Sequence, residues 1–309
     1  MEIFYSGFSY SKNGNCPEDN EDAFECSNEG GRFAIADGAT QSTFTKEWVQ
    51  YLVKHFIKVP IPTNVTLDVV DPLIIQEWLA PVRQEWQASI DWKSLPWWAE
   101  NKARTVGALS TLLGLQIITL EAESNHFLWQ ALACGDSNLF VLREGNLFTA
   151  FPLRKSDEFN NSPALLSSYQ KAAQPSIMKS QGLLTRDDVI FLCTDALAKW
   201  FLSQYEAGQK PWEYLLALST QNSFQQMIDH LRTAGTIHND DTTLVTISLN
   251  SETKLTPRIF PENIVFEKTA SAEGNQCLPT KSHRIGRFRT NIKWRFSIPK
   301  WPFRTKNSK

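Results

Sequence analysis

The stretch FAIADGATQS at residues 33–42 sets an apolar run directly before a carboxylate, Asp37. A run of this kind is suited to burial as a strand. The same arrangement recurs in VIFLCTDAL, where Asp195 closes the run, and in reverse in NDDTTLVTI, where Asp240 precedes it. Three strand-like segments that lie far apart in the sequence therefore each present an acid at one end.

Two later segments change from strand to helical periodicity. In STFTKEWVQYLVKHFI, residues 42–57, apolar side chains recur every three or four positions, which predicts an amphipathic helix begun by a Ser or Thr cap. The segment DPLIIQEWLAPVRQEWQAS, residues 71–89, predicts a second helix that is interrupted at Pro81. Its tryptophans recur at helical spacing, so we expect them to pack in a core rather than line a ligand cage.

The order of the remaining segments predicts an α+β fold. Residues 107–122 and 127–150 contain apolar runs separated by turn residues, and REGN in the second range is typical of a hairpin turn. A further strand ends at Asp195, helices follow it, and a last strand begins at Thr242. Strands in antiparallel runs with helices grouped between them favour stacked layers over alternating βαβ units.

The composition is that of a soluble globular protein. Of 309 residues, 42% are hydrophobic and 21% are charged, and no apolar run approaches the roughly 20 residues that cross a bilayer. The N-terminus lacks a basic segment followed by an apolar one, so nothing predicts export. The five cysteines have no CxxC spacing, which argues against a disulfide framework or a zinc site. We therefore expect a cytoplasmic protein.

Charge divides the chain into an acidic body and a basic tail. Ten of the 31 Lys and Arg residues lie from Lys281 onward, where Asp and Glu are absent, so residues 1–280 carry a net charge of −12. We assign residues 1–250 to the main domain, 251–280 to a linker and 281–309 to the tail.

The tail interleaves its cations with aromatic side chains, namely Phe288, Trp294, Phe296, Trp301 and Phe303. Charged termini commonly stay unfolded, but a purely solubilising tail has no use for five aromatics. The pattern predicts a regulatory or targeting role through an anionic protein or membrane surface, and nucleic acid is the less favoured partner. Docking on the acidic body is a further alternative.

The acids at the strand ends predict a common site only when they are considered together. Any one of them has a plain explanation as a turn residue, a helix cap or a loop acid. If the strands share a sheet edge, the carboxylates converge, and like charges at close range must be protonated or neutralised by cations. A site made of oxygen ligands suits Mg²⁺ or Mn²⁺, whereas the five histidines have no ligand spacing.

Six motifs carry a resemblance to a known family. They are NEDAF, FAIADG, GALSTLLGL, ACGDSNLFVLREG, FLCTDAL and NDDTTLVTI. Their order and approximate spacing over nearly all of residues 1–250 resemble the metal-dependent serine/threonine protein phosphatase 2C family, and the segment LPWWAENKARTVGALSTLLGL is similar to a bacterial branch of it. The resemblance implies a catalytic domain folded as a four-layer α/β/β/α sandwich of two antiparallel sheets flanked by helices.

The resemblance also implies a reaction and its residues. The reaction is hydrolysis of phosphoserine and phosphothreonine in proteins by a water activated between two Mn²⁺ or Mg²⁺ ions. The residues that match the first ion's ligands and catalytic acids are Asp37, the Gly38 carbonyl, Asp195 and Asp240. Those that match the second ion's ligands are Glu21 and Asp22, and Asp136 matches an acid that reaches a third ion in many members.

Three positions depart from the family pattern. Pro17 stands where many members have a phosphate-gripping arginine, and Lys12 is the nearest cation that could replace it, or else a solvated loop residue. Ala39 cannot donate a proton, so water or His238 would have to protonate the leaving alkoxide. Lys199 stands where some members have a third-metal acid, so we expect Asp136 to bind a third ion weakly or not at all.

Two other functions remain open at this point. One is a pseudophosphatase that binds phosphoproteins or acts through its tail; Pro17 and Ala39 favour it mildly, while the intact acids favour activity. The other is a metal-dependent nuclease that grips DNA with the tail, which the order of the motifs disfavours. As an enzyme, the protein would act on a phosphorylated protein in signalling, opposite a serine/threonine kinase.

Overall fold

We describe the chain from a computed structural model, which covers residues 2–61, 69–120, 126–160, 162–172 and 175–250. These residues belong to one compact unit, Met1–Phe266. The expected linker and tail lie outside the described residues. None of the helices described in this unit is both long and apolar enough to cross a membrane.

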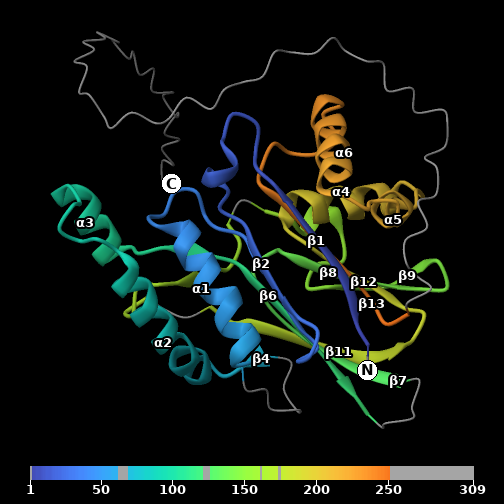
Figure 1. The fold of residues 1–309 in the computed structure, drawn as a ribbon, viewed down its shortest axis with the longest axis horizontal. Coiled ribbons are helices and arrows are strands. Elements are labelled where there is room, and N and C mark those ends of the chain that lie inside the picture. The colour runs from blue at the N-terminus through green and yellow to red at the C-terminus, as the bar shows by residue number, and fades with distance from the viewer. Residues whose placement is uncertain (1, 62–68, 121–125, 161, 173–174, 251–309) are drawn as a thin grey trace, which may run out of the picture. The chain divides into compact units, whose positions relative to one another are not determined.

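Two antiparallel sheets form the centre of the unit (Figure 1). The five-stranded sheet has, in spatial order, β1 (Phe4–Tyr10), β13 (Thr242–Ser248), β12 (Val189–Cys193), β8 (Asn138–Arg143) and β9 (Asn146–Phe151). The six-stranded sheet has β2 (Ala23–Ser27), β3 (Arg32–Ala36), β6 (Leu112–Thr119), β7 (His126–Cys134), β11 (Ile177–Thr185) and β4 (Val69–Val70). A small pair joins β5 (Leu109–Ser110) to β10 (Leu166–Ser167).

Helices cover the outer face of each sheet. In Figure 1, α1 (Thr45–Lys58) and α2 (Pro72–Ser89) lie on one side of the strands, with α3 (Trp97–Thr105) beyond them. On the other side lie α4 (Asp195–Glu206), α5 (Pro211–Leu216) and α6 (Gln221–Thr233). The layers are therefore α/β/β/α, which confirms the predicted sandwich of two antiparallel sheets flanked by helices.

The strands alternate their side chains between two cores. In β3, Phe33 and Ile35 enter the core between the sheets, whereas Ala34 and Ala36 pack against α1. Small residues on that face let the helix approach closely. Gly114 of β6 does the same, because a Cβ there would lie 2.3 Å from the ring of Phe56. The apolar runs in the sequence are thus strands with both faces buried.

Both predicted helices form, with differences at particular residues. The first helix begins at Thr45, and the residue before it, Phe44, has a left-handed backbone with φ of 57° and makes no side-chain cap, so the predicted Ser or Thr cap is wrong. The second helix continues through Pro81 without interruption. Pro81 lies on the exposed side, while Trp78 and Trp86 are buried against the first helix and hold the chain helical. These tryptophans are core residues, as predicted.

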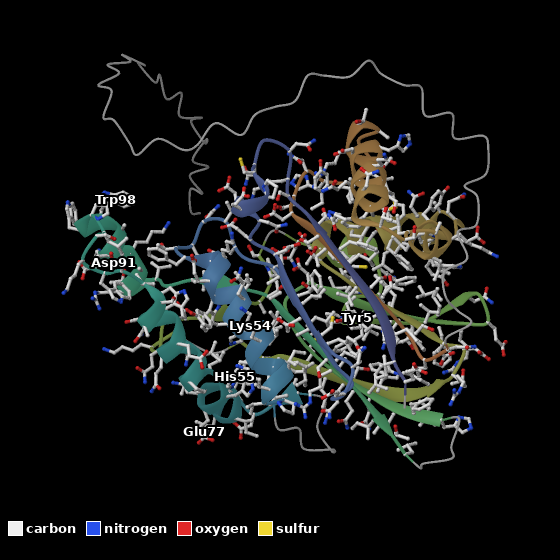
Figure 2. The ribbon with its side chains drawn as sticks, viewed as in Figure 1. Tyr5, Lys54, His55, Glu77, Asp91 and Trp98 are labelled. Atoms are coloured by element: carbon white, nitrogen blue, oxygen red, sulfur yellow. The ribbon has the colours of Figure 1, made fainter. Side chains whose placement is uncertain are left out.

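The surface also carries aromatic side chains that the cores do not use. Trp97 and Trp98 at the start of α3 are 80% and 57% exposed, and Figure 2 shows Trp98 at the outer end of the helix layer. In the middle of that layer, His55 stacks edge-on against Trp78 with 5.0 Å between ring centroids.

The predicted REGN hairpin is also present, since β8 and β9 pair across it.

Candidate active site

Five aspartates converge at one end of the sandwich. Asp37 follows β3, Asp136 follows β7 and Asp195 follows β12, while Asp22 precedes β2 and Asp240 precedes β13. The negative charges of the other four all act on Asp37 and, after burial itself, raise its pKa well above the usual range. The structure therefore brings together acids that lie more than 200 residues apart in the sequence.

The turn after β3 holds Asp37 through its backbone. The Asp37 amide donates to Thr111 Oγ1 at 3.0 Å, and the Asp37 carbonyl accepts from the Thr111 amide at 2.8 Å. Gly38 next forms a bridge to Ser110. A side chain at Gly38 would meet Thr45 Cγ2 at 2.2 Å and the Glu21 carbonyl at 2.8 Å, so only glycine fits where these three segments meet.

Asp22 is buried and only partly satisfied. Its Oδ2 atom accepts hydrogen bonds from Thr194 Oγ1 at 3.0 Å and from Thr243 Oγ1 at 2.8 Å. Its Oδ1 atom is also buried but has no hydrogen-bond partner among the described groups. Burial raises the pKa of Asp22 well above its usual range, and Asp241 and Asp195 add to the rise. A buried acceptor without a donor costs free energy unless a ligand satisfies it.

Asp195 is the first residue of α4 and lies near the other acids of the site. Burial raises the pKa of Asp195, and the charge of Asp240 adds to the rise. Asp136 borders the same cleft, and burial together with the charge of Asp195 raises the pKa of Asp136 to about 7. The acidic side chains of this cleft therefore repel one another when they are ionised.

Lys12 is the cation that lies among these acids. Its Nζ atom is 3.6 Å from Glu21 Oε2 and 3.8 Å from Asp240 Oδ1, and it donates to Thr40 Oγ1 at 3.0 Å. Partial burial alone would lower the pKa of Lys12, but Asp241, Asp240 and Glu21 outweigh it and raise that pKa. Of the two interpretations of Lys12, the geometry favours a residue of the cleft over a solvated loop lysine.

Asp241 is a residue of this cleft whose role the sequence did not reveal. Its Oδ1 atom accepts from the Lys12 amide and its Oδ2 atom from the Glu21 amide, both at 2.8 Å. Asp241 is 3% exposed, so one buried carboxylate ties two loops to the start of β13. The sequence also did not reveal Thr194 and Thr243 as partners of Asp22. All these contacts depend on the pairing of strands that lie far apart in the sequence.

A cleft of about 400 Å³ extends from Asp136 and Asp195 across the start of α4. Lys199 and His238 line it, and the charge of His238 acts on Asp195. Both residues therefore lie beside these acids. Ala39 donates its amide to the Leu109 carbonyl and offers no side chain to the chemistry, whereas Pro17 begins an exposed 3₁₀ turn, Pro17–Asp19.

The donor set fits a hard cation in its chemistry. The available atoms are carboxylate oxygens and the Gly38 backbone, and the unpartnered Oδ1 atom of Asp22 is a buried acceptor that a cation would satisfy. Within the described part of the chain, however, no three acidic, histidine or cysteine side chains are arranged so that they could hold an ion as they stand.

Comparison with known proteins identifies the fold. No family model matches the chain, and no curated protein is similar in sequence. Among solved structures, the serine/threonine phosphatase PstP/Ppp of Mycobacterium tuberculosis matches with a TM-score of 0.52 and 15% identity, over 81% of this chain and 100% of that one. PppA, a key regulatory component of T6SS in Pseudomonas aeruginosa, matches with a TM-score of 0.50 and 19% identity, over 80% and 98% of the two chains. The chain has the fold of protein phosphatase 2C.

Proposed function

We propose that this protein hydrolyses phosphoserine and phosphothreonine in other proteins in a reaction that depends on Mn²⁺ or Mg²⁺. The observation that carries the proposal is the convergence of Asp22, Asp37, Asp136, Asp195 and Asp240 on one cleft. Such a set of acids is costly to bury, and a stable fold retains it where the charges serve a ligand. The protein phosphatase 2C fold supports the same conclusion independently.

We assign the ligands from the match to the family's motifs. Asp37, the Gly38 carbonyl, Asp195 and Asp240 would hold one ion. Glu21 and Asp22 would hold the second, and the unpartnered Oδ1 atom of Asp22 supports that role. When bound, the ions would neutralise the charge of the phosphate ester and make a water molecule nucleophilic near neutral pH. We expect Asp136 to hold a third ion weakly, because Lys199 lies across the same cleft.

The chain's own side chains have further roles in this proposal. Lys12 would bind a phosphate oxygen of the substrate, because its ammonium already lies within 4 Å of Glu21 and Asp240 at the site. Asp241 would position both Lys12 and Glu21 through their backbone amides. His238 lines the cleft and would protonate the leaving alkoxide, which the side chain at Ala39 cannot do.

The test is turnover of p-nitrophenyl phosphate with and without Mn²⁺. We expect activity that requires the ion and disappears with EDTA. The variant that tests the site is Asp37→Asn. Its control is Glu18→Gln, because Glu18 is an exposed acid on the loop that leads to the cleft. Full turnover in EDTA would refute the metal-dependent mechanism, whereas full turnover by Asp37→Asn in the presence of Mn²⁺ would refute the role of Asp37.

A pseudophosphatase is the second candidate, and one observation favours it. Among the described residues, no three acidic, histidine or cysteine side chains are arranged so that they could hold an ion as they stand. In that case the cleft would bind a phosphoprotein without hydrolysing it. Calorimetric titration with Mn²⁺ separates the two candidates, because the pseudophosphatase would bind no ion at this cleft and hydrolyse no ester.

The partners follow from the proposed reaction. The substrate would be a phosphorylated protein, and a serine/threonine kinase would oppose the phosphatase in bacterial signalling within the cytoplasm. We also propose that the tail, residues 281–309, binds an anionic protein or membrane surface. A chain ending at residue 274 should keep its activity on p-nitrophenyl phosphate and lose salt-sensitive binding to anionic vesicles.

A further inference from the structure

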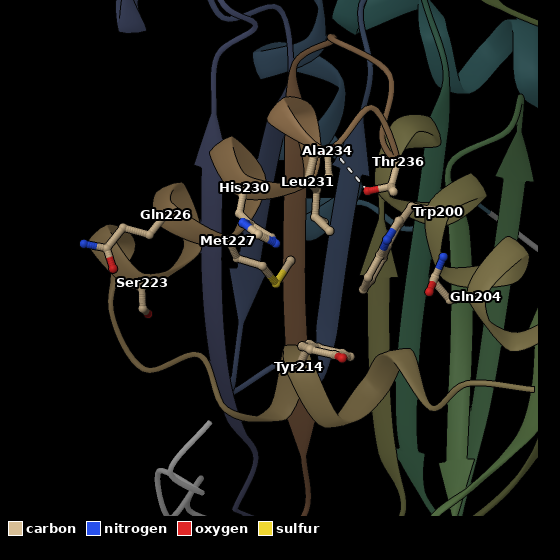
Figure 3. Close-up of a pocket in the computed structure, with 10 residues that line it drawn as sticks. All are labelled: Trp200, Gln204, Tyr214, Ser223, Gln226, Met227, His230, Leu231, Ala234 and Thr236. Atoms are coloured by element: carbon tan, nitrogen blue, oxygen red, sulfur yellow. Dashed lines mark hydrogen bonds between the residues drawn. The ribbon is translucent and has the colours of Figure 1, made fainter. Parts of the chain in front are cut away.

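A second cavity lies in the helix layer outside the site described above. It has a volume of about 280 Å³ and is enclosed by α4, α5 and α6 (Figure 3). Its walls include Trp200, Tyr214 and Met227, which present two aromatic rings and a thioether to the space. Gln204 lies at its edge and offers an amide group, whereas the amide of Gln226 points away from the space. The cavity is an apolar pocket with hydrogen-bonding groups around it.

The pocket adjoins the acidic cleft. Trp200 and Thr236 line both spaces, so one side chain of α4 and one of the loop after α6 form the partition between them. The same loop continues through His238, which borders the cleft, to Asp240. A molecule that reaches from one space into the other therefore passes directly beside the proposed site of hydrolysis.

The size and charge of the pocket restrict what it can hold. Sites for cofactors and small molecules usually measure about 300–1,000 Å³, so this pocket suits one or two side chains better than a whole small molecule. None of the ten residues that line it is Asp, Glu, Lys or Arg, so the pocket has no fixed charge with which to select an ionic group. Tyr214 is 37% exposed, so an arriving side chain can cover apolar surface that is now in water.

We propose that this pocket binds one large apolar side chain, aromatic or aliphatic, of the phosphoprotein substrate, at a position near the phosphorylated residue. The inference rests on the proposed function, and the continuity of the pocket with the cleft decides the occupant. An extended substrate segment would place its phosphoryl group among the acids and a neighbouring side chain against Trp200, Tyr214 and Met227. Gln204 would accept or donate a hydrogen bond to the backbone of that segment.

The experiment fills the pocket without touching the acids. Ala234 lines the pocket at the end of α6, and Ala234→Phe should occupy the space. Thr233→Phe is the matched control, because Thr233 is the adjacent exposed residue and does not line the pocket. Tyr214→Ala, which removes one wall, is a second variant in case the first fails to fold. The probes are p-nitrophenyl phosphate and short phosphothreonine peptides that carry a single Trp at successive positions, with Ala as the reference.

The expected result is a loss of discrimination. Wild type and Thr233→Phe should hydrolyse at least one Trp-containing peptide with a kcat/KM about tenfold or more above its Ala counterpart, and Ala234→Phe should treat the two alike. All variants should hydrolyse p-nitrophenyl phosphate equally. Equal kcat/KM for all peptides in the wild type would overturn the proposal, as would a matching loss on p-nitrophenyl phosphate.

A binding measurement separates failure of the pocket from failure of the proposed function. If wild-type protein hydrolyses nothing with Mn²⁺, the proposed function fails, and fluorescence anisotropy of the labelled peptides then tests the pocket alone. Tighter binding of a Trp peptide that Ala234→Phe abolishes would support the pocket. Equal binding by both proteins would overturn it, and so would sedimentation that reveals a dimer disrupted by Ala234→Phe, since the occupant would then be a second copy.

Discussion

The strand β12 has an acid near each end, and the fold treats the two acids in opposite ways. Asp188, just before the strand, is 2% exposed and paired with Arg143, whose Nη2 atom lies 2.6 Å from Asp188 Oδ2. Asp188 also accepts from the amide and the hydroxyl of Thr185. Asp195, at the other end, lies near other carboxylates, and burial together with the charge of Asp240 raises its pKa.

Asp188 therefore stabilises the fold, whereas burial of the acids around Asp195 costs free energy. At the Asp188 end, the chain supplies its own cation and enough donors to satisfy the carboxylate. At the Asp195 end, Lys12 is the only cationic side chain of the described residues within 4 Å of a cleft acid, and it reaches Glu21 and Asp240 alone. Among the described residues, this lack of a partner cation supports the cation site that we propose at this end of β12.

The largest expected effect comes from removing an acid of the cleft. Asp37→Asn should lower kcat on p-nitrophenyl phosphate by about a thousandfold or more, equivalent to about 4 kcal/mol, because it removes a ligand of the proposed ions. Folding should be kept, since the substitution removes a buried charge that its neighbours oppose. Steady-state kinetics and thermal unfolding of the same sample measure the two effects. A large fall in the melting temperature would mean that Asp37 stabilises the fold as Asp188 does.

At the other end of the strand the same kind of change should affect stability instead. Arg143→Met leaves Asp188 buried without its cation and should lower the free energy of unfolding by about 3 kcal/mol, with kcat unchanged. Urea denaturation measures the loss. Arg143→Met combined with Asp188→Asn is the control and should recover part of it, because a neutral amide is less costly to leave unpaired. A single variant as stable as wild type would remove the contrast between the two ends.

Added cation should stabilise the protein through the cleft. At a Mn²⁺ concentration about a hundredfold above the dissociation constant, the free energy of unfolding should rise by about 2.7 kcal/mol. Asp22→Asn should reduce this gain, because it alters a proposed ligand whose Oδ1 atom has no partner. Thermal unfolding with and without Mn²⁺ measures the shift. An equal shift in Asp22→Asn would exclude Asp22 as a ligand.

The smallest effect should come from the residue that positions the loops. Asn at position 241 offers one acceptor oxygen, so either the Lys12 or the Glu21 amide would lose its partner. We expect Asp241→Asn to raise the KM for p-nitrophenyl phosphate and the inhibition constant of inorganic phosphate by about tenfold, with a smaller change in kcat. Asp19→Asn, an exposed acid on the same loop, is the control. An unchanged inhibition constant would show that Asp241 has only a structural role.

Local pattern predicted most of the strands and helices and the acids at the ends of three strands, whereas the four-layer order and the other proposed ligands followed from the resemblance to protein phosphatase 2C. Apolar runs marked β3 and β12 as strands buried on both faces, and the period of the first amphipathic segment marked α1. The predicted interruption of the helix at Pro81 was wrong, because the packing of Trp78 and Trp86 outweighs one missing backbone hydrogen bond. Local pattern likewise did not predict the left-handed backbone of Phe44, just before α1.

The sequence by itself determined which side chains stand at the ends of which strands, because that depends only on neighbours along the chain. Only the tertiary structure decided which of these acids have partners. Arg143 meets Asp188, Thr243 meets Asp22 and Asp241 meets the Lys12 amide across separations of 45, 221 and 229 residues. Such contacts arise from strand order and sheet stacking, and the apolar pocket between α4, α5 and α6 arises in the same way.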